Sequence, residues 1–261
     1  MLKLGIIGGG NMGEAIIARA RGKYKICVCE ANAARASFLK KKYKIKTLDL
    51  EGLIGASDII LLAVKPQDIG FVLEGIAKNK IKNLLFVSIA AGITSRFIER
   101  RLGQRARVVR TMPNMPALIG EGITALSKGR FASMQDLKTA QALFNNIGPT
   151  LIVEEKWIDA VTAVSGSGPA YVFLFTECLM NAARALGFKD AQARQLVYQT
   201  LLGSAHLLEK ATDDAATLRA KVTSKGGTTK AAMDVFMAHK LEKIFVDALT
   251  AAYRRAKELA K

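Results

Sequence analysis

Three glycines near the start of the chain have the spacing of a pyrophosphate-binding turn. Gly8, Gly10 and Gly13 stand in the order G-x-G-x-x-G, directly after an apolar run and at the start of a helical pattern. The first glycine makes a tight turn, the second lets the backbone approach the phosphates, and the third lets the helix pack closely on the strand. The backbone of Asn11 and Met12, at the positive end of the helix, would complete the site. A purely structural turn is the alternative, but the strand and the helix around it favour dinucleotide binding.

A carboxylate follows where dinucleotide-binding folds often carry one. Glu30 lies about 20 residues after Gly10, at the end of the second expected strand. It can accept hydrogen bonds from the ribose hydroxyls of adenosine and would repel a 2′-phosphate, which favours NADH over NADPH. Arg35 or Lys40 could still receive a phosphate, and a solvated glutamate needs no ligand. The expected cofactor is therefore NAD(P)H, with a slight preference for NADH.

Three more loops are expected at the same edge of a parallel sheet, where open α/β folds bind their ligands. They follow apolar strands and contain small, rigid or polar residues over 63–67, 88–92 and 112–116. Pro66 is expected to start the next helix. Asn114 is the best polar candidate, although as a turn residue it needs no function. The loop residues expected to line the cofactor are Ala63, Val64, Lys65, Pro66, Ala90 and Asn114.

A hydroxyl-rich loop in the second half has the composition of an anion-binding site. Residues 222–230 read Val-Thr-Ser-Lys-Gly-Gly-Thr-Thr-Lys and open a predicted helix. Backbone N–H groups at such a helix start can bind a carboxylate. Helix capping needs only one hydroxyl, whereas this loop has four, so ligand binding is favoured over capping. By contrast, residues 165–171, which read Ser-Gly-Ser-Gly-Pro-Ala-Tyr, are largely explained as the cap of a helix.

The elements that must position these residues alternate through the first half of the chain. Alternating strands and helices predict a parallel, doubly wound sheet with right-handed crossovers. The expected strands cover 2–7, 25–29, 45–48, 58–64, 84–89, 106–110, 121–126 and 149–153. The expected helices of this half cover 11–21, 32–42, 66–77, 94–102 and 133–145. Residues 1–154 are therefore predicted to form a Rossmann-type dinucleotide-binding domain.

The second half, residues 155–261, has a helical pattern without convincing strands. Its expected helices cover 157–164, 168–186, 190–210, 214–221, 227–238 and 240–259. Helix 168–186 is apolar on nearly all sides, so it is expected to be buried. So much apolar surface favours a homodimer or a larger assembly, and a monomeric bundle packed on the first domain is the alternative. The predicted fold is α/β, a Rossmann-type domain followed by an all-α dimerisation domain.

Composition limits the function further. The 261 residues carry a net charge of +17, but the basic residues are scattered and no nucleic-acid-binding motif accompanies them, so no nucleic-acid partner is expected. No apolar run reaches the roughly 18 residues of a membrane span and no signal peptide is evident, which predicts a cytoplasmic protein without membrane contact. Cys27, Cys29 and Cys178 are too few for a disulfide framework, and Cys27 and Cys29 are expected to be packing residues, so no metal site is expected.

Taken together, these segments resemble those of pyrroline-5-carboxylate reductases. They run in the family's order over nearly the whole chain, as GIIGGGNMGEAI at 5–16, AVKPQ at 63–67, VVRTMPNMPALIGEG at 108–122, SGSGPAY at 165–171 and VTSKGGTT at 222–229. The last two are far more specific than the glycine turn. Two positions depart from the family pattern, because its members usually carry proline at Lys225 and glycine at Ala232. These departures affect the stiffness of the loop and the packing of its helix.

The resemblance implies reduction of the cyclic imine L-1-pyrroline-5-carboxylate to L-proline, the last step of proline biosynthesis, by hydride from NAD(P)H. It also implies a helical domain that interlocks with a second subunit, and rings of such dimers. Carried over by position, the substrate would lie among Val222, Ser224, Gly226, Gly227, Thr228 and Thr229. Backbone N–H groups would hold its carboxylate, and the hydroxyl of Thr229, the catalytic residue, would point toward the ring nitrogen.

The residues themselves agree with this chemistry. The chain has only two histidines, His206 and His239, and both are expected on helix surfaces. An imine nitrogen is basic enough to arrive protonated or to take a proton through water, so positioning matters more than a strong side-chain acid. Two alternatives stay open. A keto-acid or other imine reductase, such as a β-hydroxyacid dehydrogenase, would need a lysine in helix 168–186, which has none; a non-catalytic nucleotide sensor leaves the hydroxyl-rich loop unexplained.

Overall fold

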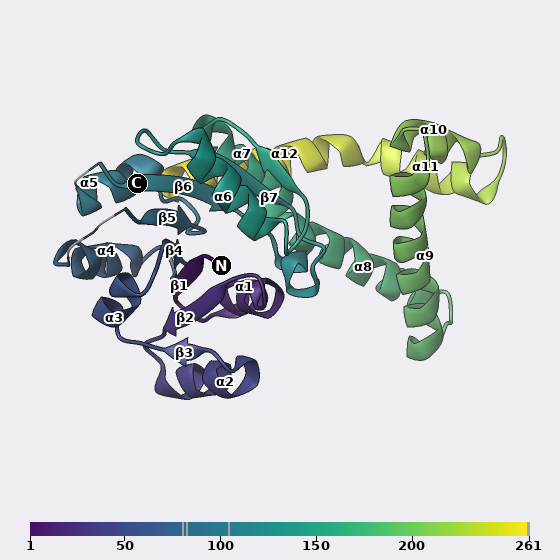
Figure 1. Ribbon diagram of the computed structural model, residues 1–261. Coiled ribbons are helices and arrows are strands. Elements are labelled where there is room, and N and C mark those ends of the chain that lie inside the picture. The colour runs from purple at the N-terminus through teal and green to yellow at the C-terminus, as the bar shows by residue number, and fades with distance from the viewer. Residues whose placement is uncertain (80, 82, 104, 260–261) are drawn as a thin grey trace. The chain divides into compact units, whose positions relative to one another are not determined.

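The structure, a computed structural model, describes residues 1–79, 81, 83–103 and 105–259. The chain forms two compact units (Figure 1). The first unit contains residues 1–167 and the end of the chain from Ala251, and the second contains Gly168–Thr250. The sheet lies in the first unit, and the described elements of the second are all helices. The domain division at residue 154 stays a prediction.

A sheet of eight described strands forms the centre of the first unit, in the order β3-β2-β1-β4-β5-β6-β7-β8 (Figure 1). Its strands are β1 (Lys3–Ile7), β2 (Lys25–Cys29), β3 (Lys46–Thr47), β4 (Ile59–Leu62), β5 (Leu85–Ser88), β6 (Arg107–Met112), β7 (Thr124–Lys128) and β8 (Thr150–Ile152). Neighbouring strands are parallel except for β6 and β7, which are antiparallel. Each strand overlaps an expected range, so the predicted α/β fold is confirmed.

Helices cover both faces of this sheet. They are α1 (Asn11–Ala20), α2 (Ala33–Tyr43), α3 (Leu50–Gly55), α4 (Ile69–Ala77), α5 (Ser95–Leu102) and α6 (Met134–Phe144). Strand β4 shows the arrangement, because Ile59 and Leu61 pack in a cluster with residues of α1, α2 and α6. Ile60 and Leu62 pack in a second cluster with residues of α3, α4 and α5. A strand buried on both faces has no polar positions, which explains its wholly apolar sequence.

Three local features differ from the expectation. The short helix α3 is not among the expected helices, and the side chain of Asp49 caps it. The prediction that Pro66 starts a helix is wrong, because α4 begins at Ile69. Pro66 instead lies in a turn that Asp68 N–H closes by donating to the Lys65 carbonyl at 2.9 Å. Between β6 and β7 the chain reverses through a short 3₁₀ helix, η1 (Met115–Ile119), so these two strands are not parallel.

The segment before the second unit is one expected helix, over 157–164, but the structure breaks it into three turns. These are a 3₁₀ turn (Glu155–Trp157), α7 (Ile158–Val161) and a π-helical turn (Thr162–Gly166). Ser167 N–H donates to the Thr162 carbonyl at 2.8 Å, which widens the helix. A Cβ on Gly166 would come 2.6 Å from Cε of Met112, so a larger residue there would require this flexible side chain to move. Gly166 therefore packs close to Met112, whereas a Cβ on Gly168 would meet no atom within 4 Å.

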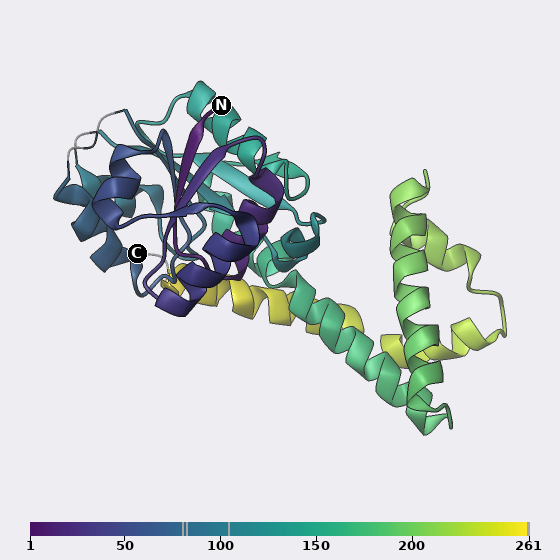
Figure 2. The same ribbon diagram turned by 60° about the horizontal axis from the view of Figure 1, so that its bottom comes forward.

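The second unit confirms the expected helices. It contains α8 (Gly168–Ala185), α9 (Asp190–Lys210), α10 (Ala215–Lys221), α11 (Thr228–Ala238) and the first part of α12 (Leu241–Leu259). Figure 2 shows α8 and α9 joined by a tight turn. In that turn Gly187 has φ of +95°, and Phe188 N–H donates to the Ala183 carbonyl at 3.2 Å. This glycine ends α8 as its sequence position predicts.

The prediction that helix 168–186 is buried is wrong for the single chain. Val172, Phe173, Leu174 and Phe175 of α8 keep 43–60% of their surface exposed. An apolar sequence predicts burial but does not say which molecule supplies the cover, and exposed apolar surface of this kind marks an interaction site. The helical run Glu155–Ala185 is also long and apolar enough to cross a membrane, with 11% of its most apolar window buried. Length and composition alone are weak support for a span, because a helix buried in an assembly has the same composition.

Candidate functional site

The glycine turn after β1 has the close contacts that its spacing predicts. Gly8 has φ of +97°, and a Cβ on it would come 2.5 Å from the carbonyl oxygen of Ala63. A Cβ on Gly13 would overlap the carbonyl oxygen of Gly8, so only glycine lets α1 approach the turn this closely. Gly10 is the N-cap of α1, and a Cβ on it would meet no atom within 4 Å. The turn is therefore open beside the N–H groups that would bind phosphates.

The side chains of Glu30 and Arg35 form hydrogen bonds with the backbone of this turn. The Glu30 carboxylate accepts a hydrogen bond from Gly9 N–H at 2.6 Å and another from Asn32 N–H at 2.8 Å. Arg35 Nε donates to the Gly9 carbonyl at 2.7 Å. An ionised carboxylate has about four acceptor positions, so Glu30 keeps capacity for the hydroxyls of a ribose.

Glu14 links α1 to α2 next to the turn. Its carboxylate accepts hydrogen bonds from Tyr43 Oη at 2.7 Å and from Lys42 Nζ at 2.9 Å, and it pairs with Arg35. Burial alone would raise the pKa of Glu14, but the hydrogen bonds from Tyr43, Lys42 and Arg35 outweigh it and lower the pKa to about 2. The guanidinium of Arg35 is thus already engaged by Glu14 and by the turn.

Replacing Glu14 by glutamine is expected to destabilise the protein at neutral pH. Because the pKa of the folded carboxyl is about 2 against an ordinary 4.5, its contribution to stability is complete above pH 4.5 and is lost as the pH falls toward 2. The lowered pKa corresponds to about 3 kcal/mol of stability. Urea unfolding at fixed protein concentration should show this deficit for Glu14→Gln at neutral pH, and the deficit should shrink below pH 4.5.

The matched control is Glu74→Gln, which removes an exposed ion pair with Arg101. That variant should lose at most about 1 kcal/mol at any pH. A deficit of Glu14→Gln that is the same at neutral and acid pH would contradict the assignment.

The predicted cofactor loops follow neighbouring strands of the sheet. Because β1, β4, β5 and β6 are adjacent, the residues after their ends lie along one edge. Ala63 continues the pairing of β4 with β1, which places it against Gly8. A Cβ on Gly8 would also come 3.0 Å from Cγ1 of Val64, whereas Lys65 and Pro66 are exposed. The structure therefore brings the glycine turn and the start of this loop together.

Two further candidates at this edge have structural contacts of their own. Ala90 is buried, and its N–H donates to Ser88 Oγ at 3.2 Å. Asn114 Oδ1 accepts a hydrogen bond from Ile123 N–H at 2.9 Å. This bond spans the chain reversal between β6 and β7. Asn114 therefore has a structural role in this turn, which was the alternative to cofactor binding.

The hydroxyl-rich loop lies in the second unit, between α10 and α11. Gly227 is the N-cap of α11 and has no side chain to accept hydrogen bonds from the first N–H groups of the helix. Gly227 N–H donates to the Ser224 carbonyl at 3.1 Å and closes a turn in which Gly226 has φ of +71°. Thr228 and Thr229 are the first two residues of α11, so their N–H groups and hydroxyls gather at one helix end. Such an end can bind a carboxylate.

Other residues of this region have different surroundings. Val222 follows α10 and is 66% exposed. Thr223 Oγ1 donates to the Arg219 carbonyl at 2.6 Å, so this hydroxyl is used within the preceding helix. His206 and His239 are both exposed, as predicted.

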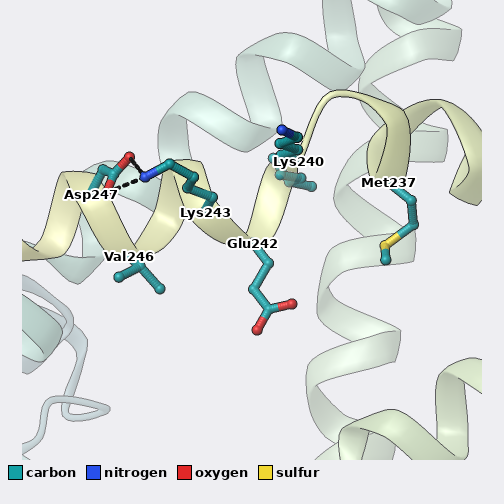
Figure 3. A pocket seen from close by; sticks show the side chains of 7 residues that line it. Met237, Lys240, Glu242, Lys243, Val246 and Asp247 are labelled. Carbon is teal, nitrogen blue, oxygen red and sulfur yellow. Dashed lines mark hydrogen bonds and ion pairs between the residues drawn. The ribbon is translucent and has the colours of Figure 1, made fainter.

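A hollow at the junction of α11 and α12 matches no motif. Its volume is about 420 Å³. Figure 3 shows that Lys243 pairs with Asp247 there, while Lys240 lies between the two helices. Lys240 has φ of +52°, which ends one helix before the next begins. The hollow contains no residue of the loop 222–229, so it is separate from the predicted substrate site.

Arg110 is a buried charged residue that the motifs do not single out. It lies on β6 and is 2% exposed. Its Nη2 donates to Asp159 Oδ1 at 2.7 Å, and its Nη1 lies 3.5 Å from Glu155 Oε1. The Glu155 carboxylate also accepts from Ser95 N–H at 2.7 Å and from Ser95 Oγ at 2.5 Å. This network joins β6, the start of α5 and the segment before the second unit.

Metal binding finds no support among the described residues, which contain no group of three or more His, Cys, Asp or Glu side chains able to hold an ion. Cys27 lies in the apolar cluster of α3, α4 and α5, and Cys29 packs against that cluster. Burial raises the pKa of both thiols. Both cysteines are free, and their predicted packing role is confirmed.

Comparison with known families separates the chain into two matched regions. Residues 155–259 match the model for pyrroline-5-carboxylate reductase dimerisation, and residues 3–92 match the model for coenzyme F420-dependent NADP oxidoreductase. The pyrroline-5-carboxylate reductase of Synechocystis sp. is 40% identical over 100% of this chain and 99% of its own length. That of Pseudomonas aeruginosa is 37% identical over 99% of this chain and 97% of its own length.

Solved structures give the same result. A pyrroline-5-carboxylate reductase from Coxiella burnetii has a TM-score of 0.92 and 36% identity, covering 100% of this chain and 99% of its own. The pyrroline carboxylate reductase of Plasmodium falciparum, solved with NADP bound, has a TM-score of 0.89 and 30% identity, covering 100% and 98%. These similarities extend through both units. The chain belongs to the pyrroline-5-carboxylate reductase family.

Proposed function

We propose that this protein reduces L-1-pyrroline-5-carboxylate to L-proline by hydride transfer from NAD(P)H. The observation that supports the proposal is that one chain of this family carries two arrangements suited to the two ligands. One is the open glycine turn at the start of α1, and the other is the uncapped start of α11 with Thr229 in its first turn. Relatives that cover the whole chain and bear this activity in their names support the same conclusion.

The chemistry needs orientation more than a strong acid. Bound dihydronicotinamide supplies a hydride to the imine carbon, and the ring nitrogen keeps or takes one proton. The N–H groups at the start of α11 would bind the substrate carboxylate, and the Thr229 hydroxyl would hydrogen-bond the ring nitrogen. Holding the two reactants in near-attack geometry can contribute up to roughly 7–11 kcal/mol. The protein thus supplies position, and the cofactor supplies the electrons.

Steady-state oxidation of NADH and of NADPH, followed by absorbance with L-1-pyrroline-5-carboxylate as the substrate, tests the proposal. Turnover that forms proline is the expected result. Cofactor binding without turnover would favour the nucleotide sensor. A keto-acid dehydrogenase of the lysine-dependent type is disfavoured by α8, in which no lysine occurs.

We further propose that NADH is the preferred cofactor. The carboxylate of Glu30 is fixed beside the glycine turn, where it would accept hydrogen bonds from the ribose hydroxyls and repel a 2′-phosphate. Arg35, the nearest guanidinium, is engaged by Glu14 and Gly9. Both features support the same preference.

Replacing Glu30 by glutamine is expected to raise the NADPH to NADH ratio of kcat/KM about tenfold, because a hydrogen bond to a charged group and a repulsive charge are both lost. Glutamine keeps one oxygen for the Gly9 N–H and loses the acceptor for the Asn32 N–H, which is exposed and can bind water instead. Glu51→Gln, on the exposed surface of α3, is the control and should leave the ratio unchanged. An unchanged ratio for Glu30→Gln would remove Glu30 from cofactor selection.

We propose that the protein acts as a cytoplasmic homodimer or larger homo-oligomer whose α8 packs against another subunit. The half-exposed Phe173 and Leu174 and the match to a dimerisation model support this. Sedimentation of the intact chain should give the mass of a dimer or of a multiple of it. A monomer at micromolar concentration would contradict the proposal.

A further inference from the structure

A polar pocket lies in the first unit, between α5, the end of β7 and the residues after β8. Its volume is about 720 Å³, which falls in the range of about 300–1,000 Å³ that is common for small-molecule sites. Four basic residues line it, namely Arg96, Arg100, Lys128 and Arg130. No residue assigned above to the cofactor or to the substrate lines this pocket.

The four cations of the pocket form no ion pair with any described residue. Ion pairs between exposed side chains do form elsewhere in the described residues, as between Lys230 and Asp234 and between Lys243 and Asp247. Four like charges around one hollow repel one another, and an anion placed between them relieves that repulsion. Guanidinium groups match phosphate oxygens through paired hydrogen bonds. The rim therefore favours a phosphate group.

The floor of the pocket has the opposite character. Glu99 is 8% exposed, and its Oε1 accepts a hydrogen bond from Arg130 N–H at 2.8 Å. Glu155 is fixed by Ser95 and Arg110. A Cβ on Gly129 would overlap Glu99 Oε1, so glycine is needed for this close approach. Carboxylate oxygens on a floor repel an anion and accept hydrogen bonds from hydroxyl groups.

We propose that this pocket binds a phosphate ester whose other end carries hydroxyl groups, with the phosphate at the basic rim and the hydroxyls toward Glu99 and Glu155. Sugar phosphates and nucleoside monophosphates share this chemistry. Phe131 lines the same pocket, and the Arg130 guanidinium lies 5.4 Å from the centre of its ring. Because the pocket shares no residue with the glycine turn, the ligand binds in the presence of NADH.

Calorimetric titration of the intact protein with ribose 5-phosphate and with adenosine 5′-monophosphate, at saturating NADH, tests the proposal. Saturable binding of at least one ligand is expected, and tighter binding of the nucleotide would assign a role to Phe131 in stacking the base. The double variant Arg100→Gln/Arg130→Gln should weaken binding at least tenfold, because two charge-assisted hydrogen bonds are lost. Both side chains are exposed, so the variant should melt like the wild type.

The control variant Lys41→Gln/Lys138→Gln removes the same charge from exposed positions on α2 and α6. Its binding should stay within about twofold of the wild type, since distant surface charges are screened by salt. An equal loss of ligand affinity in both double variants would mean that the ligand is attracted only by the general positive charge of the protein. That result would overturn the proposal. Absence of saturable binding at millimolar ligand, or displacement of the ligand by NADH, would also overturn it.

Discussion

Replacing Thr229 by alanine is expected to lower kcat/KM for the imine about 100-fold, because loss of one positioned hydrogen-bond donor has this effect in other active sites. Thr229 is the second residue of α11, where its hydroxyl lies beside the N–H groups that would bind the substrate carboxylate. The predicted cofactor residues follow β1, β2, β4, β5 and β6 and do not belong to α11, so the Kd for NADH should not change. Steady-state turnover and fluorescence titration of NADH measure the two quantities separately.

Two variants of the same region serve as controls. Thr229→Ser keeps the hydroxyl and should recover most of the activity. Thr223→Ala removes a hydroxyl that already donates to the Arg219 carbonyl, so it should change kcat/KM by less than about threefold. Normal turnover in Thr229→Ala, or equal losses in Thr223→Ala, would show that Thr229 has no role at the ring nitrogen.

The sheet could be predicted because its strands are buried on both faces. Ile59 to Leu62 are all apolar, because helices cover both faces of the strand. This pattern does not depend on which helices provide the cover. The order of glycines 8, 10 and 13 was equally informative, since Gly8 and Gly13 have steric or conformational requirements that few other residues meet, and Gly10 leaves the turn open. Local chemistry of this kind is readable from sequence.

Features that depend on a distant or external partner could not be predicted in the same way. The antiparallel pairing of β7 depends on the chain reversal at η1, which Asn114 stabilises through Ile123. The residues of α8 stay exposed in the single chain, so its apolar sequence led to a wrong expectation. Pro66 illustrates a third limit, because its fixed φ suits a turn as well as a helix start.

The buried ion-pair network of Arg110 is difficult to predict from the sequence. The signal was a single arginine in the otherwise apolar run Val108-Val109-Arg110, with a polar residue after it. Its partners, Glu155 and Asp159, lie more than forty residues away, as the separations of 45 and 49 positions show. No spacing rule connects residues so far apart.

Removal of the Arg110 side chain is expected to give the largest loss of stability of any substitution considered. In Arg110→Ala, the carboxylates of Glu155 and Asp159 stay largely buried, with 29% and 13% of their side chains exposed, and lose their cation. Breaking a buried ion pair in this way costs about 3–5 kcal/mol. Urea unfolding at one fixed protein concentration should show the loss, because assembly also affects apparent stability.

The control is Arg101→Ala, which removes an arginine whose ion pair with Glu74 is exposed and should cost at most about 1 kcal/mol. A second comparison separates ionic pairing from lost packing. If the loss comes from the unpaired Asp159 carboxylate, the double variant Arg110→Met/Asp159→Leu should be more stable than Arg110→Met, since replacing both partners by apolar groups removes the uncompensated charge. A double variant less stable than Arg110→Met would instead assign the role of Arg110 to packing between β6 and α7. The Nε of Arg110 is buried and has no hydrogen-bond partner among the described residues. This unsatisfied donor lowers the stability that the network contributes, so apolar side chains at the same positions can give a similar stability.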